Sequence, residues 1–236
     1  MPRFRFGGNG PGAGWGWQAG VMSSRRVEIV DAAPAGRLPR GRHGLSREQV
    51  RESQRGRIFL AMAAAMAEKG YVDTTVADVV KGSGVGRESF YQLFTGKLDC
   101  FLQAFDVVGD MLLGRLEQAG GQAETPPLAR FEHAFGEYLT VLADQPALAR
   151  VFLVEVYAAG PEAMQRRADL QDRIVGRMAT VLGADGPDER FACQVLVAAV
   201  ANLVTGPVTA GDTAALGRLR HQVVDLVGRA LALRDG

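Results

Sequence analysis

The stretch TTVADVVKGSGVGRESFYQLF, residues 74–94, contains two short helical patterns separated by glycines. Thr75 followed three positions later by Asp78 has the form of a capping box, which predicts a helix over about Val76–Lys81. Gly84 suits the left-handed conformation that ends a helix and redirects the chain. A second helical pattern follows this turn at once. Two short helices joined in this way predict a helix-turn-helix.

The same glycines raise an alternative, a loop that binds the phosphates of a nucleotide. A P-loop needs a Lys-Ser or Lys-Thr pair after its last glycine, and a dinucleotide site needs a preceding strand. The sequence has neither, because the residues before the glycines follow a helical period. The nucleotide interpretation is therefore rejected.

The second helix of the motif, predicted over Arg87–Phe94, has an apolar face and a polar face. Phe90 and Phe94 lie four positions apart and would pack against the first helix. The side chains that remain on the outside or beside it are those of Arg87, Glu88, Ser89, Tyr91 and Gln92. Arginine can pair with guanine and glutamine with adenine, and a tyrosine hydroxyl can hold a phosphate. This face therefore suits the major groove of DNA.

The longer segment Gly70–Phe101 resembles the DNA-binding domain of the TetR family of transcriptional repressors. The matching features are Gly70-Tyr71, Thr74-Thr75-Val76, Gly84-Val85, Phe90-Tyr91, Phe94 and Lys97. The resemblance implies an all-α protein with two domains. A three-helix DNA-binding domain would occupy residues 45–96, and a larger helical domain for effector binding and dimerisation would occupy residues 97–236.

The resemblance also implies roles for single residues. Thr75, Tyr91 and Lys97 would contact phosphates, and Arg87, Ser89 and Gln92 would face base edges. Three positions depart from the family pattern: Gly86 where a serine often caps the helix, Glu88 where glycine is common, and Leu93 where His or Tyr is common. These departures keep a second hypothesis open, a helical dimeric module that binds a small molecule or a protein and has lost specific DNA binding.

The N-terminal part is basic and the remainder is acidic. Residues 1–57 carry eleven arginines against four acidic residues, whereas the rest carries 16 basic and 22 acidic residues. This separation favours a polyanion contacted at one end. Residues 1–44, rich in Gly, Pro and Arg, are predicted to be disordered. Arg40 and Arg42 could enter a minor groove or belong to a solvated tail, and Arg47 could touch the DNA backbone or simply lie on the surface.

Beyond the motif, turn signals divide a series of helical patterns. Helices are expected near 97–119, 128–143, 146–159, 162–182, 188–204 and 213–232, with a break at GGQAETPP, residues 120–127.

The last two of these helices are candidates for a homodimer interface. Residues 191–204 carry no charge, and residues 213–232 have apolar side chains at a 3-4 spacing typical of helix packing. They could form a four-helix bundle with a second copy, as the resemblance also implies, or pack only within one chain. The candidates are Val195, Leu196, Ala199, Leu216, Leu219, Val223 and Leu226.

Aromatic residues of the larger domain could either form its core or line the effector pocket that the resemblance implies. The candidates are Phe105, Phe135, Tyr138, Phe152, Tyr157, Gln194 and Asn202. A pocket of this composition would take a largely apolar small molecule, with its few polar groups fixing the orientation of the ligand.

Other functions find little support. The three histidines are scattered, so neither a metal, a cofactor nor enzyme activity is expected. No run of eighteen apolar residues is present, and the sequence predicts a cytoplasmic protein without a membrane span. The expected function is that of a ligand-responsive regulator, released as a repressor from a palindromic DNA operator by a small molecule.

Overall fold

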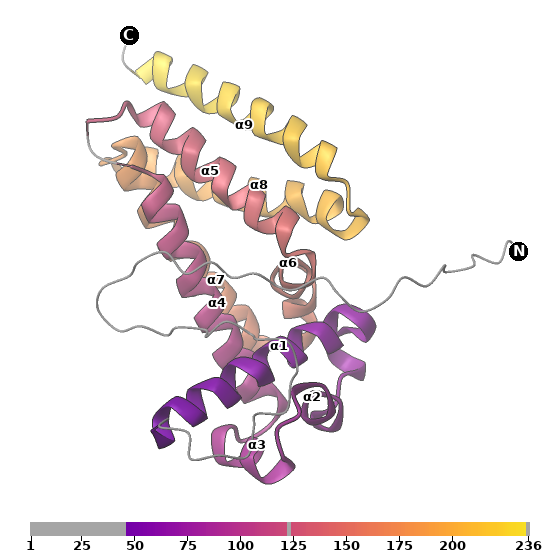
Figure 1. The fold of residues 1–236 in the computed structure, drawn as a ribbon. Coiled ribbons are helices and arrows are strands. Elements are labelled where there is room, and N and C mark those ends of the chain that lie inside the picture. Colours follow the sequence, from indigo (N-terminus) through magenta and orange to yellow (C-terminus); the bar gives the residue numbers. More distant parts are fainter. Residues whose placement is uncertain (1–45, 122–123, 235–236) are drawn as a thin grey trace, which may run out of the picture. The chain divides into compact units, whose positions relative to one another are not determined.

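The computed structural model describes residues 46–121 and 124–234, and this part of the chain is almost entirely helical (Figure 1). No strand occurs within these ranges. The helices are α1 Arg47–Asp73, α2 Val76–Ser83, α3 Arg87–Leu93, α4 Lys97–Ala119, α5 Pro127–Asp144, α6 Pro146–Leu153, η1 Glu155–Ala159, α7 Pro161–Leu182, α8 Pro187–Ala210 and α9 Thr213–Arg234. The predicted all-α fold, with a helix-turn-helix followed by a larger helical body, is confirmed.

The chain separates into two compact units, Met1–Arg57 and Ile58–Gly236. In the first unit, Ser46 and Gln49 exchange hydrogen bonds at the start of α1. The Gln49 amide donates to Ser46 Oγ at 3.1 Å, and the Ser46 amide donates to Gln49 Oε1 at 2.7 Å. The predicted arm at residues 1–44, with Arg40 and Arg42, lies outside the described residues.

In the second unit, Gly70 interrupts helix α1 close to its end. Its backbone angles, φ 80° and ψ 166°, are not helical, and α1 continues only to Asp73 beyond it. A positive φ is costly for residues that carry a Cβ, so glycine is suited to this position. Gly70 therefore ends the regular part of α1.

An aromatic core joins α1–α4 to α6, η1 and α7. The Phe90 side chain is fully buried, and its ring lies 5.3 Å from that of Phe94, which in turn lies 5.7 Å from Phe59. Burying one such side chain stabilises the fold by roughly 1.5–3 kcal/mol. The helix-turn-helix is therefore held on its apolar side by the same core that reaches into the body.

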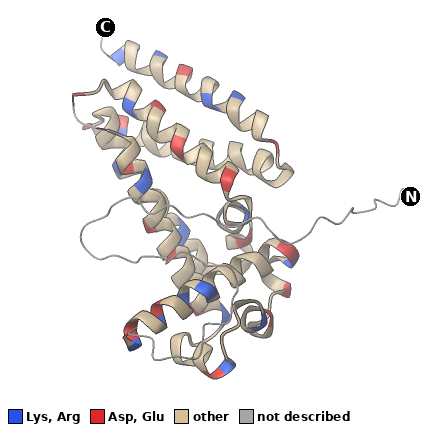
Figure 2. Cartoon of the chain, in the orientation of Figure 1, with Lys and Arg blue, Asp and Glu red and all other residues tan. Residues whose placement is uncertain are grey.

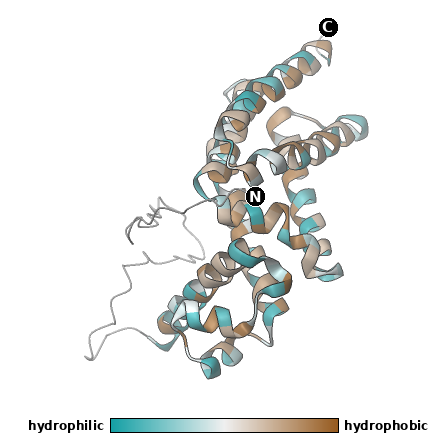
Figure 3. Cartoon of the chain, turned by 90° about the vertical axis from the view of Figure 1, so that its right-hand side faces the viewer, coloured by the Kyte–Doolittle hydropathy of each residue, from teal (hydrophilic) through white to brown (hydrophobic). Residues whose placement is uncertain are grey.

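A second core lies among α5, α6, α7, α8 and α9. Helices α5 and α9 run side by side within it (Figure 1). Its α8 side chains are Cys193, Val197, Val200, Val204 and Val208. These helices each carry hydrophobic and hydrophilic residues, so one face of each is left to the surface (Figure 3).

The expected helix over residues 146–159 is wrong as a single element. Helix α6 ends at Leu153, Val154 has the non-helical angles φ −123° and ψ −58°, and η1 begins at Glu155. Both Glu155 and Val156 are buried in the first core. The break lets these two side chains reach that core, a tertiary effect that the local pattern does not contain.

Helix α8 continues beyond its expected end at residue 204 to Ala210, and Pro207 lies inside it. Its length and composition alone would suffice to cross a membrane, and only 28% of its most apolar window is buried. Its central part carries no Lys, Arg, Asp or Glu (Figure 2). Since its valines pack into the second core, α8 is a helix of the folded body with one uncovered apolar face.

Candidate nucleic-acid interface

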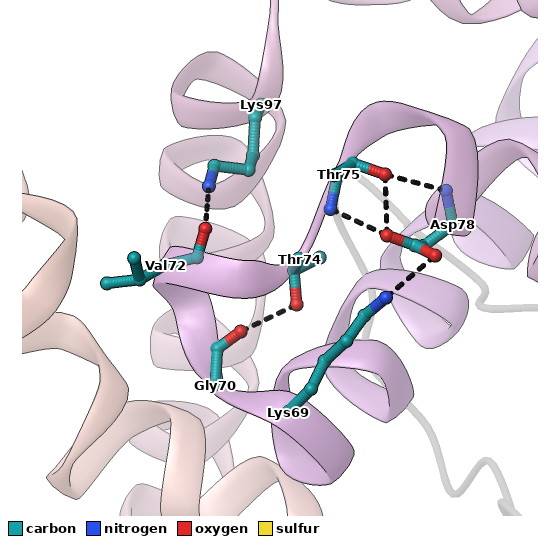
Figure 4. A network of polar contacts seen from close by, with 7 residues as sticks. All are labelled: Lys69, Gly70, Val72, Thr74, Thr75, Asp78 and Lys97. Carbon is teal, nitrogen blue, oxygen red and sulfur yellow. Dashed lines mark hydrogen bonds and ion pairs between the residues drawn. The ribbon is translucent and has the colours of Figure 1, made fainter.

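The first helix of the motif, α2, begins with a complete capping box. The Asp78 amide donates to Thr75 Oγ1 at 3.3 Å, and the Thr75 amide donates to Asp78 Oδ2 at 2.8 Å. Lys69 forms an ion pair with the other oxygen of Asp78 at 2.7 Å (Figure 4). The bonds from Lys69 and then Thr75 hold the pKa of the Asp78 carboxyl well below its usual range. The predicted cap is confirmed, and it fixes Thr75 at an exposed position.

The turn between α2 and α3 is short and is held by hydrogen bonds and a buried side chain. Gly84 has φ 63°, the left-handed conformation expected of it. The Ser83 hydroxyl donates to the Val80 carbonyl and accepts from the Val85 amide, each at 3.2 Å. Val85 is buried, so the turn is anchored in the core. The angle between the two helices is thus set by a glycine, a hydroxyl and one apolar side chain.

Helix α3 presents the predicted polar face. Arg87, Glu88, Tyr91 and Gln92 are exposed, Ser89 is half-buried, and Phe90 is buried beneath them. Gly86, the N-cap, makes no side-chain cap bond, as its departure from the family pattern suggested. The face that sequence reasoning assigned to DNA is therefore one continuous exposed surface.

Two pairs of side chains order this surface. Arg87 Nη2 donates to the Tyr91 hydroxyl at 3.4 Å, and its guanidinium carbon lies 5.4 Å from the centre of the Tyr91 ring. Gln92 Nε2 donates to Glu88 Oε1 at 3.4 Å. Such contacts one turn apart on an exposed helix are worth about 0.2–0.5 kcal/mol, so they are easily exchanged for contacts with a base or a phosphate. Glu88 has a neutral partner on its own helix, Gln92, so its negative charge remains on this surface.

Lys97, the first residue of α4, is half-buried rather than extended into solvent. Its Nζ donates to the carbonyl oxygen of Tyr71 at 2.8 Å. It also donates to the carbonyl oxygen of Val72 at 3.3 Å (Figure 4). Nζ also lies 4.2 Å from the centre of the Tyr71 ring. The ammonium group is therefore positioned by the end of α1, a constraint that sequence reasoning did not foresee. Arg47 is exposed, in the other unit.

Four effector-binding candidates pack into the two cores, where Phe105 and Phe135 are buried and Phe152 and Tyr138 are half-buried, and three are exposed. The rings of Phe105 and Phe152 stack at 4.2 Å in the first core, and those of Phe135 and Tyr138 lie 6.4 Å apart in the second. Burial raises the pKa of the Tyr138 hydroxyl, which keeps it neutral and able to donate. The remaining candidates, Tyr157, Gln194 and Asn202, have exposed side chains.

The dimer candidates also divide. Leu216, Leu219 and Val223 are buried in the chain's own second core, so they pack within one chain. Leu196 is half-buried, while Val195, Ala199 and Leu226 are exposed. Two further exposed apolar side chains on α8, Phe191 and Leu203, were not among the candidates. The sequence signal that could have identified Phe191 and Leu203 was their position in a helical segment without charged residues.

The described residues hold no group of three or more His, Cys, Asp or Glu side chains that could bind a metal ion. What they do present is a rigid two-helix unit with a polar, arginine-bearing outer helix. This is the architecture of a helix-turn-helix that reads DNA.

Comparison with known proteins agrees with this architecture. Residues 58–104 match the family model described as "Bacterial regulatory proteins, tetR family". No curated protein sequence matched the chain.

Solved structures match the fold over most of the chain. The transcriptional regulator FadR from Bacillus subtilis, in complex with stearoyl-CoA, is similar with a TM-score of 0.65 at 21% identity, over 72% of this chain and 95% of its own. FadR from Bacillus halodurans has a TM-score of 0.65 at 20% identity, with the same coverage. A putative transcriptional regulator from Pseudomonas aeruginosa PAO1 has a TM-score of 0.64 at 18% identity, over 81% of this chain and 96% of its own.

The fold and the site therefore define a DNA-binding transcriptional regulator. Residues 58–104 match the tetR family model, and the resemblance inferred from the sequence is confirmed for this segment.

Proposed function

We propose that this protein is a homodimeric repressor that leaves a palindromic operator when it binds a largely apolar small molecule. The observation that carries the proposal is the outer face of α3, where Arg87, Tyr91 and Gln92 are exposed above a fully buried Phe90. A short helix held this firmly can enter a major groove without losing much conformational freedom. Its place of action is the cytoplasm, where the operator DNA lies.

On the DNA, the roles divide between bases and phosphates. Arg87 and Gln92 have the donors and acceptors to read guanine and adenine, with Ser89 beside them. Thr75, at the exposed start of α2, and Lys97, at the start of α4, would hold phosphates on either side of the groove. Tyr91 links the base-reading residues to the phosphate-holding ones, because its hydroxyl accepts a hydrogen bond from Arg87.

A second copy supports the two-fold symmetry that such an operator requires. Helix α8 exposes Phe191, Val195 and Leu203, and α9 exposes Leu226. Large exposed apolar side chains on two neighbouring helices are candidates for burial in an interface. Packing these faces against their copies would bury them and would pair two α3 helices with two half-sites.

The stacked pair Phe105 and Phe152 supports an effector that acts through α4. Phe105 lies on α4 and Phe152 on α6, and their rings touch at 4.2 Å. An apolar ligand inserted between such rings would separate α4, which begins at Lys97, from α6. By likeness to the FadR structure with stearoyl-CoA, we take a long-chain acyl thioester as the first ligand class to test. The ligand can lower DNA affinity only by its preference for the released state.

The direct test is selection of duplexes from a random-sequence DNA library by the full-length protein, followed by gel-shift titration of the enriched sequence. We expect a palindromic sequence, a dimer on it, and release on adding stearoyl-CoA. A folded dimer that enriches no sequence would favour the module that has lost specific DNA binding. Release by no acyl-CoA, with intact operator binding, would reject the ligand class alone.

A further inference from the structure

Glu155, the first residue of η1, is a buried carboxylate outside the helix-turn-helix. Within the described ranges, the buried polar side chains are those of Glu155, Thr74 and Ser83. A carboxylate in such a place destabilises the fold unless its oxygens are hydrogen-bonded. The hydrogen-bond partners of Glu155 therefore show which parts of the chain its carboxylate fixes in place.

The two oxygens of Glu155 have different partners. Oε2 accepts from the backbone amide of Tyr71 at 2.8 Å, across 84 positions of sequence. Oε1 accepts from Arg150 Nε at 3.2 Å, and the Arg150 side chain is partly exposed. One oxygen thus binds the end of α1, while the other is tied to α6, where Arg150 belongs.

The neighbouring glycine is shaped for this contact. A Cβ at Gly70 would lie 3.3 Å from Glu155 Oε2, closer than most such contacts, and φ at Gly70 is already 80°. The turn thus leaves room for the carboxylate and exposes the Tyr71 amide to it. Glycine at this position therefore serves both the turn and the approach of Glu155.

Tyr71 connects Glu155 to Lys97. The same residue that donates its amide to Glu155 accepts Lys97 Nζ at its carbonyl oxygen at 2.8 Å. Its ring lies beneath Nζ and packs edge-on against Phe101 of α4 at 5.4 Å. The position of the Lys97 ammonium group thus depends on where the Tyr71 backbone is held.

We propose that Glu155 is a positioning residue for DNA binding: by fixing the backbone of Tyr71, it fixes the ammonium group of Lys97 for a phosphate. This inference rests on the proposed function, in which Lys97 contacts the operator backbone. Without the Glu155 bond, the Tyr71 amide must find another partner, and the carbonyl that orients Lys97 moves with it. The contact on DNA would then be lost although Lys97 is still present.

A first experiment tests the link without DNA. The protein contains three lysines, Lys69, Lys81 and Lys97, so amine acetylation can be followed at each by mass spectrometry. Glu155→Asp keeps the charge but shortens the side chain by one methylene, which removes its reach to the Tyr71 amide. We expect Lys97 to be acetylated several-fold faster in E155D, relative to Lys81, and Glu162→Gln, an exposed carboxylate on α7, to change nothing. An unchanged Lys97 rate in folded E155D would overturn the proposal.

A second experiment measures the consequence on DNA. The salt dependence of binding to the selected duplex reports the number of phosphate contacts, with a slope of about 0.9 for each. We expect Lys97→Gln and E155D to lower this slope alike, and the double variant to lower it no further than Lys97→Gln. Additive losses, or weaker binding at an unchanged slope, would mean that Glu155 only stabilises the fold.

The two experiments separate failure of the inference from failure of the proposed function. If Lys97→Gln leaves the salt slope of the wild-type protein unchanged, the phosphate contact is wrong, and the acetylation result then decides the Glu155–Tyr71–Lys97 link by itself. If Lys97→Gln lowers the slope and E155D does not, the positioning role is wrong while the function stands. Glu155→Gln, which keeps an acceptor oxygen, should restore part of the slope lost in Glu155→Ala.

Discussion

Helices α3 and α8 each expose one face, and the two faces have opposite chemistry. Helix α3 has seven residues and shows Arg87, Glu88, Tyr91 and Gln92 to water, whereas α8 has 24 residues and shows Phe191, Val195 and Leu203. Water solvates the first face well and the second badly. The polar face can therefore remain open until DNA arrives, while the apolar face needs a permanent cover. The polar face of α3 therefore suits a reversible contact, and the apolar face of α8 suits a permanent one.

The largest effect is expected from placing a charge on the apolar face. Val195→Glu would put an uncompensated carboxylate into the proposed dimer contact, at a cost on the order of 3 kcal/mol, so the dimer should weaken by about a hundredfold or more. Sedimentation velocity across a concentration series measures this directly. The chain itself should stay folded, because Val195 is exposed.

The matched control for this variant is the adjacent position. Gln194 is also exposed on α8 but is polar already, and Gln194→Glu should alter dimerisation much less. Equal weakening by both variants, or by neither, would contradict the assignment of the α8 face to a second copy.

The polar face should respond to loss of a single side chain without any change in assembly. Arg87→Ala is expected to weaken operator binding by about 1–3 kcal/mol and to relax preference at one base pair, since arginine reads guanine with two hydrogen bonds. Competition titrations with single-base variants of the operator measure both effects. Arg177→Ala, which removes an exposed ion pair with Glu117 on α4, is the control and should leave DNA binding unchanged. Uniform weakening on all sequences would instead make Arg87 a phosphate contact.

The frame that presents α3 depends on the cap of α2. Thr75→Ala removes the hydroxyl that accepts from Asp78 and should lower the free energy of unfolding by about 1 kcal/mol. Urea denaturation measures the loss, and Thr75→Ser, which keeps a hydroxyl, should recover most of it. If Thr75→Ser and Thr75→Ala unfold alike, the cap is not what stabilises the start of α2.

The smallest effect is expected at the uncapped start of α3. Gly86 has φ −64° and ψ 150°, and nothing lies within 4 Å of a Cβ placed there. Gly86→Ser should therefore stabilise the protein by a few tenths of a kcal/mol through a new cap. Gly84→Ala, at φ 63°, should destabilise it by about 1 kcal/mol, because only glycine adopts that conformation freely. Opposite signs in thermal unfolding distinguish the two glycines; equal signs would contradict this interpretation.

Local patterns predicted the DNA-reading part of the molecule well. The capping box at Thr75, the turn at Gly84 and the start of α4 at Lys97 all depend on residues within a few positions of one another. For this reason they could be inferred from the sequence without knowing what packs against them. The exposed face of α3 followed once Phe90 and Phe94 were assigned to the core.

Contacts between distant segments could not be predicted in this way. After the break at Val154, Glu155 is buried and accepts a bond from Tyr71, 84 positions away from it. The 3-4 spacing of Leu216, Leu219 and Val223 correctly indicated helix packing, but a periodic apolar pattern does not say which helix covers it. In the structure these side chains are used within the chain, and Phe191 and Leu203 are the ones left exposed.

The proline inside α8 has a consequence for hydrogen exchange. Pro207 has no amide hydrogen, so the carbonyl of Leu203 cannot accept the bond that a regular helix would supply from position 207. The helix therefore lacks one bond of its ladder at this point, although the Thr209 hydroxyl donates to the carbonyl of Thr205 at 2.9 Å across it. Amides after Pro207 should exchange with solvent faster than those of the valine-lined segment before it.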